Sequence, residues 1–302
     1  MSAPLAYVQG RFVPQSEARL PIHDAGVVYG ATVTEFCRTF RHRLFRLGDH
    51  LERFRQGCAA ALVPCPWAEA DLAAVAAQLV ERNAASIAAT DDLALIFFAT
   101  PGPIGYLLGQ PGAAGDGEPT LVMHTFPLPW VRYRRFFVEG VALVVPPVRQ
   151  LPAGCLEPRI KHRSRLHWWR ADQWVRRHDP KALALLLDGD GHVTETALAN
   201  FCIVRGGTVV SPPRDSILDG ISLRVTAQLC RQLGIPMSEA PFTLPECLRA
   251  DEAFLTGTAF CLAGVRWLNG REFSWPGPVT QKLMEAWAGL VGLDYVAQIL
   301  GG

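Results

Sequence analysis

Short apolar runs that alternate with turn residues organise the second half of the chain. Residues 182–187 form a nearly continuous apolar run, which predicts a buried strand. The next four residues read Asp-Gly-Asp-Gly, which is typical of a hairpin turn, and a return strand then begins at 192–195 and resumes at 201–204. Another apolar run at 141–145 ends in two prolines, so we expect a strand that leads into a loop.

The first half of the chain mixes helical and strand-like patterns. Segments 51–62 and 68–83 fit amphipathic helices, and apolar runs over 93–99 and 121–126 predict strands. A Pro-Leu-Pro-Trp sequence followed by three arginines then interrupts the pattern. We therefore expect a small domain over residues 1–128, an interdomain connector over 129–136 and a larger domain over 137–302.

Composition limits the kind of partner that the protein can have. The chain has 302 residues, enough for one large or two ordinary domains, and a formal net charge of +1. This charge gives no reason to expect nucleic acid or an anionic membrane as a partner, and no apolar stretch reaches the length of a membrane span. The eight cysteines are dispersed without a C-x-x-C pair, so we expect no disulfide framework, no metal site and a reduced, cytoplasmic location.

Lysine is scarce in this chain, and Lys161 stands in an informative place. Arginine supplies almost all of the positive charge, and the only other lysines are Lys181 and Lys282. Arginine stays protonated, whereas a lysine in a pocket can lose its proton and become a nucleophile. Lys161 follows a loop and precedes a helix-compatible segment, so it either faces a cleft or is a solvated lysine at a helix start.

Several polar residues flank the predicted strands and helices downstream. Glu195 and Asn200 interrupt the return strand and are either turn residues or side chains that point into a site. The acidic turn before them does not fit a calcium loop, because the twelfth position of that loop is Ala199 instead of a glutamate. Residues 216–223 predict a glycine turn that opens a helix, whose free N–H groups suit a phosphate, and residues 256–258 read Thr-Gly-Thr at a strand end.

In this order, these segments resemble the class IV pyridoxal-phosphate aminotransferases, a family that includes branched-chain aminotransferases, D-amino-acid aminotransferases and aminodeoxychorismate lyases. The resemblance rests on the interval from Lys161 to Glu195, on Asn200-Phe201, and on the motifs at 218–222 and 256–258. Matching positions also occur at 7–10, 23–30, 44–46, 50–54 and 277–280. The resemblance implies an α+β protein of fold type IV, with a small α/β N-terminal domain and a larger C-terminal pseudobarrel domain that binds pyridoxal 5'-phosphate.

The resemblance also implies a role for each matching residue. Lys161 matches the catalytic lysine, which binds the cofactor covalently and then moves the substrate proton. Glu195 matches the acid that keeps the pyridine nitrogen protonated. The other cofactor contacts that it implies are Arg53, Ile221, Ser222 and Thr258 at the phosphate, Leu218 on the ring face and Asn200 beside Glu195.

The substrate side departs from the better-known relatives. Thr34 stands where many relatives have an aromatic residue before the glutamate that matches Glu35, and Leu166 replaces a tyrosine of branched-chain aminotransferases. Residues 101–108 lack the arginine and histidine with which D-amino-acid aminotransferases bind the substrate carboxylate.

We therefore expect the carboxylate to be bound by backbone amides of the Thr258-Ala259 turn, in a site near Thr34, together with an arginine from elsewhere. Arg38 on a small-domain strand is the first candidate. Arg163 and Arg165, which lie beside Lys161, are the second.

Three functions agree with this reading. The first is transfer of an amino group between a small amino acid and a 2-oxo acid by a ping-pong mechanism, of the branched-chain or D-amino-acid type. The second is a lyase of the aminodeoxychorismate type that releases pyruvate, and the third is a cofactor-binding relative without catalysis. The resemblance further implies a homodimer in which loops of one subunit complete the site of the other.

Overall fold

The computed structural model describes residues 3–109 and 118–301, and the chain divides into two compact units. The first unit contains Met1–Leu128 and Ile160–Ser164, and the second contains Pro129–Arg159 and Arg165–Gly302. The first unit ends at Leu128, as expected for the small domain, but the units differ from the expected domains in two places. Residues 129–136 are not a connector, because most of them form helix α4 (Trp130–Val138) of the second unit, and five residues expected in the larger domain belong to the first unit.

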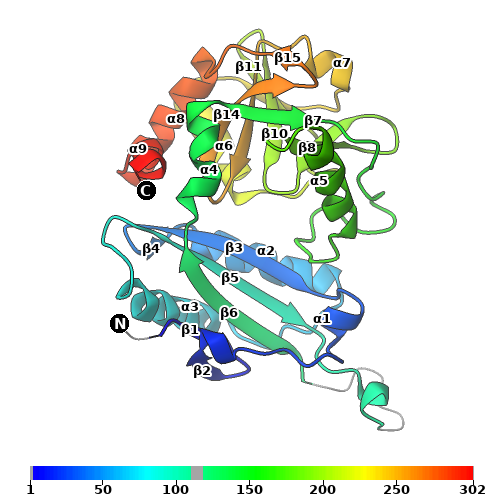
Figure 1. Ribbon diagram of the computed structural model, residues 1–302, viewed down its shortest axis with the longest axis vertical. Helices are drawn as coiled ribbons and strands as arrows, with labels where there is room; N and C mark the ends of the chain where they lie inside the picture. The colour runs from blue at the N-terminus through cyan, green and yellow to red at the C-terminus, as the bar shows by residue number, and fades with distance from the viewer. Residues whose placement is uncertain (1–2, 110–117, 302) are drawn as a thin grey trace. The chain divides into compact units, whose positions relative to one another are not determined.

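The first unit is built on a six-stranded sheet with the order β2-β1-β6-β5-β3-β4 (Figure 1). All of its pairings are antiparallel. The strands are β1 (Leu5–Val8), β2 (Arg11–Pro14), β3 (Val33–Phe40), β4 (Arg43–Leu44), β5 (Leu93–Thr100) and β6 (Thr120–Pro127). The helices are η1 (Gln15–Glu17), α1 (Ala25–Val28), α2 (Leu47–Ala60), α3 (Glu69–Ala84) and η2 (Gly105–Leu108).

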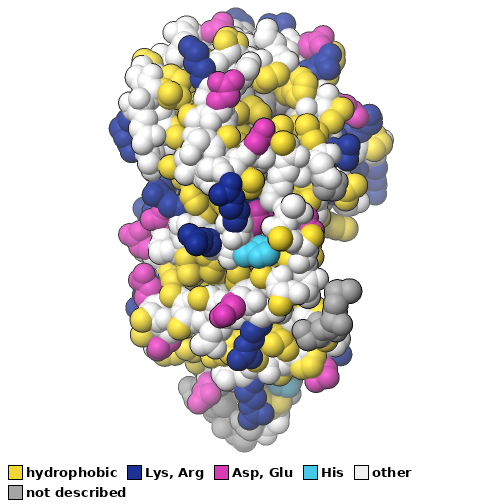
Figure 2. Space-filling model, turned by 90° about the vertical axis from the view of Figure 1, so that its left-hand side faces the viewer, with side chains coloured by type: hydrophobic (Ala, Val, Ile, Leu, Met, Phe, Trp, Pro, Cys, Tyr) yellow, Lys and Arg dark blue, Asp and Glu magenta, His cyan; other side chains and the backbone are white. Residues whose placement is uncertain are grey.

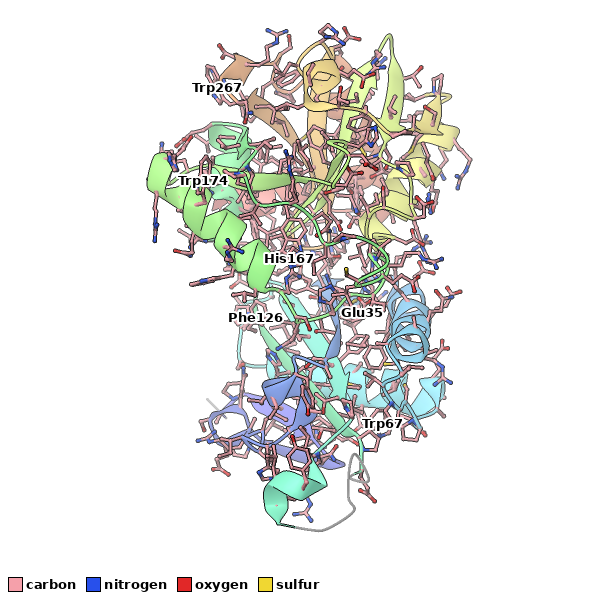
Figure 3. The ribbon with its side chains drawn as sticks, turned by 90° about the vertical axis from the view of Figure 1, so that its right-hand side faces the viewer. Glu35, Trp67, Phe126, His167, Trp174 and Trp267 are labelled. Atoms are coloured by element: carbon pink, nitrogen blue, oxygen red, sulfur yellow. The ribbon has the colours of Figure 1, made fainter. Side chains whose placement is uncertain are left out.

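Strand alternation gives this sheet two different faces. Cys37 of β3, Phe97 of β5 and Met123 of β6 are fully buried in one apolar core with residues of α2 and α3, such as Phe54 and Leu79. Neighbouring residues of a strand point to opposite faces. The residues directly before and after Cys37, Phe97 and Met123 therefore point to the other face of the sheet. Figure 3 labels Phe126 of β6 on that other face, away from α2. We call it the open face, because neither α2 nor α3 packs there.

The second unit contains a sheet that closes on itself. Its strand order is β12-β11-β10-β13-β14-β7-β8-β9, and β9 pairs again with β10, so six strands form a ring. The strands are β7 (Val141–Val144), β8 (Leu183–Leu187), β9 (Val193–Thr196), β10 (Asn200–Arg205), β11 (Thr208–Ser211), β12 (Met237–Glu239), β13 (Glu252–Gly257), β14 (Cys261–Leu268) and β15 (Arg271–Glu272). The pseudobarrel expected from the sequence is confirmed.

Helices pack outside this ring. The apolar side of α5 (Leu166–His178), with Trp168 and Val175, packs on β8 and the residues before it. The other helices of the unit are α6 (Ile221–Gln232), α7 (Leu244–Cys247), α8 (Pro278–Val291) and α9 (Tyr295–Gly301). Over the described residues, no single helix is long and apolar enough to cross a membrane. Helices α8 and α9 reach the necessary length and apolar composition only when they are counted together, across a bend of 91°.

Charge is mixed on the surface. Figure 2 shows basic and acidic side chains interspersed over the face that it presents, in keeping with the small net charge of the chain.

Candidate active site

Lys161 lies in an extended segment that continues the sheet of the first unit. The N–H of Thr34 donates to the carbonyl of Lys161 at 2.8 Å, and the N–H of Arg163 donates to the carbonyl of Thr32 at 3.1 Å. These two bonds flank a bridge between Val33 and His162, so the segment pairs with the start of β3. Lys161 is half-buried and is held by backbone bonds to a strand, not at the start of a solvated helix.

A buried ionic network lies between β3 and α2. The guanidinium of Arg53 donates from Nε to Glu35 Oε1 and from Nη2 to Glu35 Oε2, both at 2.7 Å. On the other side, His50 Nδ1 lies 2.8 Å from Glu35 Oε2. Glu35 is labelled in Figure 3 on the side of the sheet that faces α2. This network fixes the direction of the Arg53 side chain through two parallel bonds.

Electrostatics keep Glu35 ionised. Burial opposes its charge, but Arg53 and His50 outweigh burial and lower the pKa of Glu35 from 4.5 to about 2. Burial lowers the pKa of His50, against the effect of Glu35, and the charges of Arg53 and Lys161 lower it further. An ionised carboxylate only accepts hydrogen bonds, so His50 carries its proton on Nδ1 and donates it to Glu35.

Arg38 does not fit the role of substrate clamp, so that prediction is wrong. Its side chain is 1% exposed. Nε donates to the carbonyl of Thr39 at 3.0 Å, Nη2 lies 3.5 Å from Asp92 Oδ2, and the guanidinium stacks 3.9 Å from the centre of the Phe40 ring. Arg38 is thus a buried structural residue. Thr34 is also buried, and its hydroxyl donates to the carbonyl of Phe97 at 3.2 Å.

In the second unit, Glu195 and Asn200 face each other across β9 and β10. Asn200 Nδ2 donates to Glu195 Oε2 at 2.9 Å and to the carbonyl of Leu218 at 2.8 Å, while the N–H of Leu218 donates to Glu195 Oε1 at 3.1 Å. Gly220 is required beside them, because a Cβ there would lie 2.0 Å from Asn200 Oδ1. Asn200 on the neighbouring strand and the backbone of Leu218 therefore hold one buried carboxylate in place.

Helix α6 begins directly after this cluster. Its N-cap is Gly220, which has no side chain to bind the N–H groups of Ile221 and Ser222 in the first turn. Helix α6 has twelve residues and no side-chain cap, so its N-terminus attracts an anion such as a phosphate. The hydroxyl of Thr226, one turn later, donates to the carbonyl of Ser222 at 2.8 Å.

The remaining predicted residues of the second unit lie in turns. Thr258 and Ala259 belong to the turn between β13 and β14, and a Cβ on the preceding Gly257 would lie 3.1 Å from the carbonyl oxygen of Leu198. Arg165 precedes α5 and donates to the carbonyl of Ala197. Burial lowers the pKa of Arg165, whereas the charges of Glu195 and Asp172 oppose that shift.

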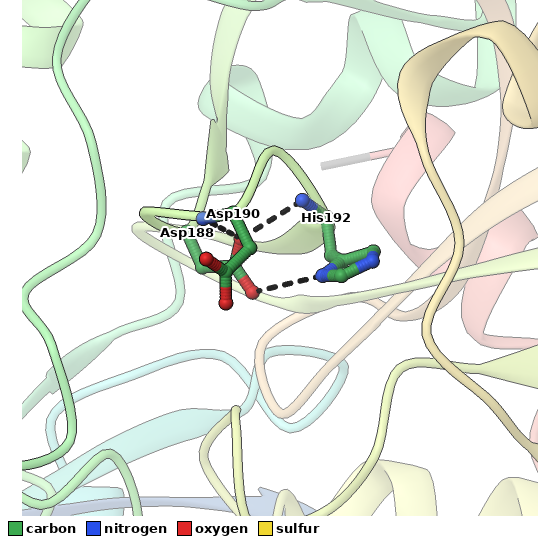
Figure 4. A group of neighbouring side chains, drawn as sticks. All are labelled: Asp188, Asp190 and His192. Atoms are coloured by element: carbon green, nitrogen blue, oxygen red, sulfur yellow. Dashed lines mark hydrogen bonds and ion pairs between the residues drawn. The ribbon is translucent and has the colours of Figure 1, made fainter.

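The acidic turn after β8 is explained without a cation. The ligand atoms of Asp188, Asp190 and His192 lie within 4.8 Å of one another (Figure 4). Asp188 Oδ1 accepts from the N–H of Asp190 at 3.0 Å and from the N–H of His192 at 2.8 Å, and its other oxygen lies 3.5 Å from the His192 ring. These bonds are those of an aspartate that stabilises its own hairpin turn.

Comparison with known proteins identifies the family. The family model described as amino-transferase class IV matches residues 32–268. The chain belongs to this family. The recognition of class IV aminotransferases from the sequence motifs is confirmed.

Relatives of this class IV aminotransferase match over almost their whole length. A Methanocaldococcus jannaschii protein assigned as a branched-chain-amino-acid aminotransferase is 29% identical over 282 residues, which cover 92% of this chain and 93% of that one. The D-alanine aminotransferase of Listeria innocua is 26% identical over 280 residues, with 91% and 92% covered. The branched-chain aminotransferase of Thermoproteus uzoniensis, solved with norvaline, superposes with a TM-score of 0.83 at 26% identity and covers 99% of this chain and 96% of its own.

These comparisons bear on the three functions left open by the sequence. Each of the relatives above carries the name of an aminotransferase, which supports amino transfer and does not favour the lyase alternative. The fold type IV architecture is likewise confirmed by the superposition.

Sequence reasoning missed the partners within the site. Asp92 as the partner of Arg38, and His50 as a member of the Glu35 network, were not foreseen. His50 does stand three residues before Arg53 on a helix, a spacing that places both on one face and could have suggested the network. No comparable signal exists for Asp92, which lies 54 residues from Arg38.

Proposed function

We propose that this enzyme moves an amino group between a small amino acid and a 2-oxo acid by a ping-pong mechanism, with pyridoxal 5'-phosphate as cofactor. The observation that carries the proposal is the carboxylate of Glu195, which is buried and oriented by the N–H of Leu218 and the amide of Asn200. A fixed buried carboxylate suits a protonated ring nitrogen, because the opposite charge compensates for its loss of hydration.

Residues of the second unit fit this cofactor. The uncapped N-terminus of α6 would bind its phosphate, Leu218 would lie against its ring, and Glu195 would hold the proton on its ring nitrogen. When bound, the cofactor withdraws electrons from the Cα atom of the substrate. In the first unit, Glu35 orients the guanidinium of Arg53, a group that is suited to bind phosphate.

Lys161 would carry the proton transfer. Its amine would hold the cofactor and, once freed by the substrate amine, would take the proton from the substrate Cα atom. The backbone bonds to β3 keep this lysine at a defined place, which proton transfer over a short distance requires.

A two-step spectral assay tests the proposal. Single amino acids are added to the yellow holoenzyme, and conversion of the cofactor to pyridoxamine 5'-phosphate is followed by absorbance; 2-oxo acids are then added to restore the original band. A complete cycle supports amino transfer. Release of pyruvate without the pyridoxamine form would support the lyase, and no response to any amino acid would support a cofactor-binding protein without catalysis.

For the substrate, we propose amino acids with small apolar side chains. The Thermoproteus uzoniensis relative was solved with norvaline, and the other relatives carry the names of branched-chain and D-alanine aminotransferases. A panel of alanine, norvaline and leucine in both L and D forms, used as donors in the assay above, tests both the size and the stereochemistry of the substrate.

We also propose a homodimer, supported by an apolar patch on the first unit. Exposed apolar side chains gather on two segments, 22–29 and 106–108. The N–H of Ile104 donates to the carbonyl of His23, and the hydroxyls of Tyr29 and Tyr106 lie 3.4 Å apart, so the two segments lie side by side. The patch consists of Ile22, Val27, Val28, Tyr29, Tyr106, Leu107 and Leu108. Such a patch on a single surface is typical of a protein interface.

Light scattering after gel filtration tests this dimer. Leu107→Glu should convert the dimer to a monomer, because it would bury a charge in the interface, whereas a dimer that persists would exclude the patch. The cytoplasmic location stays a prediction, which cell fractionation would test.

A further inference from the structure

The open face of the first unit carries a group of aromatic rings. Phe36 of β3 lies 6.1 Å from Phe126 of β6, in an edge-on arrangement, and the His124 ring stacks on Phe126 at 6.1 Å. Phe98 of β5 pairs with Thr34 in the sheet and therefore lies on the same face. A sheet face of this kind offers apolar contact to a ligand.

A cation lies on this aromatic face, close in sequence to Lys161. The guanidinium carbon of Arg163 lies 4.3 Å from the centre of the Phe98 ring, a cation–π contact that orients the side chain. Arg163 is two residues after Lys161 in the segment paired with β3, and side chains two residues apart in an extended segment point to the same side. Arg163 is exposed, so a small molecule can reach it.

His124 provides an unusual second group. Its Nδ1 atom is buried and has no hydrogen-bond partner among residues 3–109 and 118–301. Burial lowers the pKa of His124, and the nearby charge of Arg163 lowers it further, so the ring is neutral and can donate one N–H. Because Nδ1 is enclosed, the N–H that can donate to a ligand is the one on Nε2.

We propose that Arg163, held over Phe98, and His124 together bind the carboxylate of the substrate, and that Phe36 and Phe126 contact its apolar side chain. The guanidinium supplies charge and the imidazole supplies one neutral donor, a combination that suits a carboxylate. This assignment gives the role expected of Arg38 to a residue that is accessible. It rests on the proposed aminotransferase function and adds the residues that bind the substrate.

The first experiment measures binding of 4-methylvaleric acid, which has the carbon chain and carboxylate of leucine but no amine to react. The holoenzyme is titrated with this acid by calorimetry. Arg163→Leu should weaken binding roughly 10- to 100-fold, the effect of losing a charge-assisted hydrogen bond. Arg159→Leu is the matched control, because Arg159 is an exposed arginine close by in sequence that pairs with Glu157, and it should bind as the wild type does. Equal binding by both variants would overturn the proposal.

The second experiment separates the carboxylate from the rest of the substrate. His124→Phe keeps a ring that can stack on Phe126 and removes the donor, so it should raise the half-saturating concentration of leucine several-fold more than that of 3-methylbutylamine, which lacks the carboxylate. Equal changes for both donors would contradict the role of His124.

A measurement on the wild-type enzyme guards against a variant that does not fold. Phenylglyoxal modifies arginine side chains, and 4-methylvaleric acid should slow its reaction at Arg163 but not at Arg159, as followed by peptide mass spectrometry. No protection at Arg163 would overturn the proposal. Failure of this inference is distinguishable from failure of amino transfer, since the spectral cycle with 2-oxo acids does not depend on which residue binds the carboxylate.

Discussion

Replacing Glu35 by glutamine should destabilise the enzyme in a way that depends on pH. The pKa of Glu35 falls from 4.5 to about 2 on folding, and this difference corresponds to about 3 kcal/mol at neutral pH. The folded pKa lies below the unfolded one, so the stabilisation is complete above about pH 4.5 and is lost as the pH falls toward 2. Glu35→Gln also leaves the guanidinium of Arg53 buried beside a neutral amide.

Urea unfolding followed by tryptophan fluorescence and circular dichroism checks this prediction. The free energy of unfolding of the variant should lie about 3 kcal/mol below that of the wild type at pH 7, and the difference should shrink below pH 4.5. Glu139→Gln is the control, since Glu139 pairs with Lys181 at an exposed position and its loss should change little. A difference between Glu35→Gln and wild type that is small at pH 7, or constant from pH 7 to pH 3, would refute the reasoning.

Three further substitutions test the assigned roles. Lys161→Ala should abolish both the visible absorption band of the covalently bound cofactor and turnover, and a variant that keeps both would exclude this lysine. Glu195→Gln should retain the cofactor but lose turnover by about 100-fold or more, because an amide does not keep the ring nitrogen protonated; near-normal rates in a steady-state assay would contradict this. Arg38→Leu should lower the free energy of unfolding by about 3 kcal/mol, since it leaves Asp92 buried without its ion pair, while the half-saturating concentration of the amino acid changes little.

Periodicity was sufficient to predict several elements of the fold. The runs at 93–99, 121–126 and 182–187 correspond to β5, β6 and β8, and the two helical segments of the first half correspond to α2 and α3. Local patterns encode such elements, because side-chain alternation and helical spacing are properties of neighbouring residues.

The end of the small domain at residue 128 was expected from the sequence, but the assignment of residues 129–136 and 160–164 was not. Trp130, Tyr133 and Phe136 are the buried side of α4, but a proline pair and several arginines in the same stretch gave it the composition of a linker. The return of residues 160–164 to the first unit depends on pairing with Thr32 and Thr34, more than 120 positions earlier, and no local pattern records such pairing.

Arg38 shows that the partner of a side chain in the candidate site is equally hard to predict from local sequence. A polar side chain on a strand next to a site motif can contact either a ligand or another buried side chain. Only the approach of Asp92, from the residues that precede β5, decides between them, and the ion pair that results is buried. Residue type predicts what a side chain can bind, but its burial and partners depend on contacts between distant segments.

The position of residues 160–164 in the first unit has a consequence for folding of the chain during its synthesis. When residues 1–128 have left the ribosome, every strand from β1 to β6 is available, yet the N–H of Thr34 and the carbonyl of Thr32 have no strand beside them until residues 161 and 163 emerge. The first unit is thus completed only after the first part of the second has been synthesised. The last segment that completes the first unit is the one that carries Lys161, so a truncated or stalled product has an unpaired sheet edge and lacks this lysine.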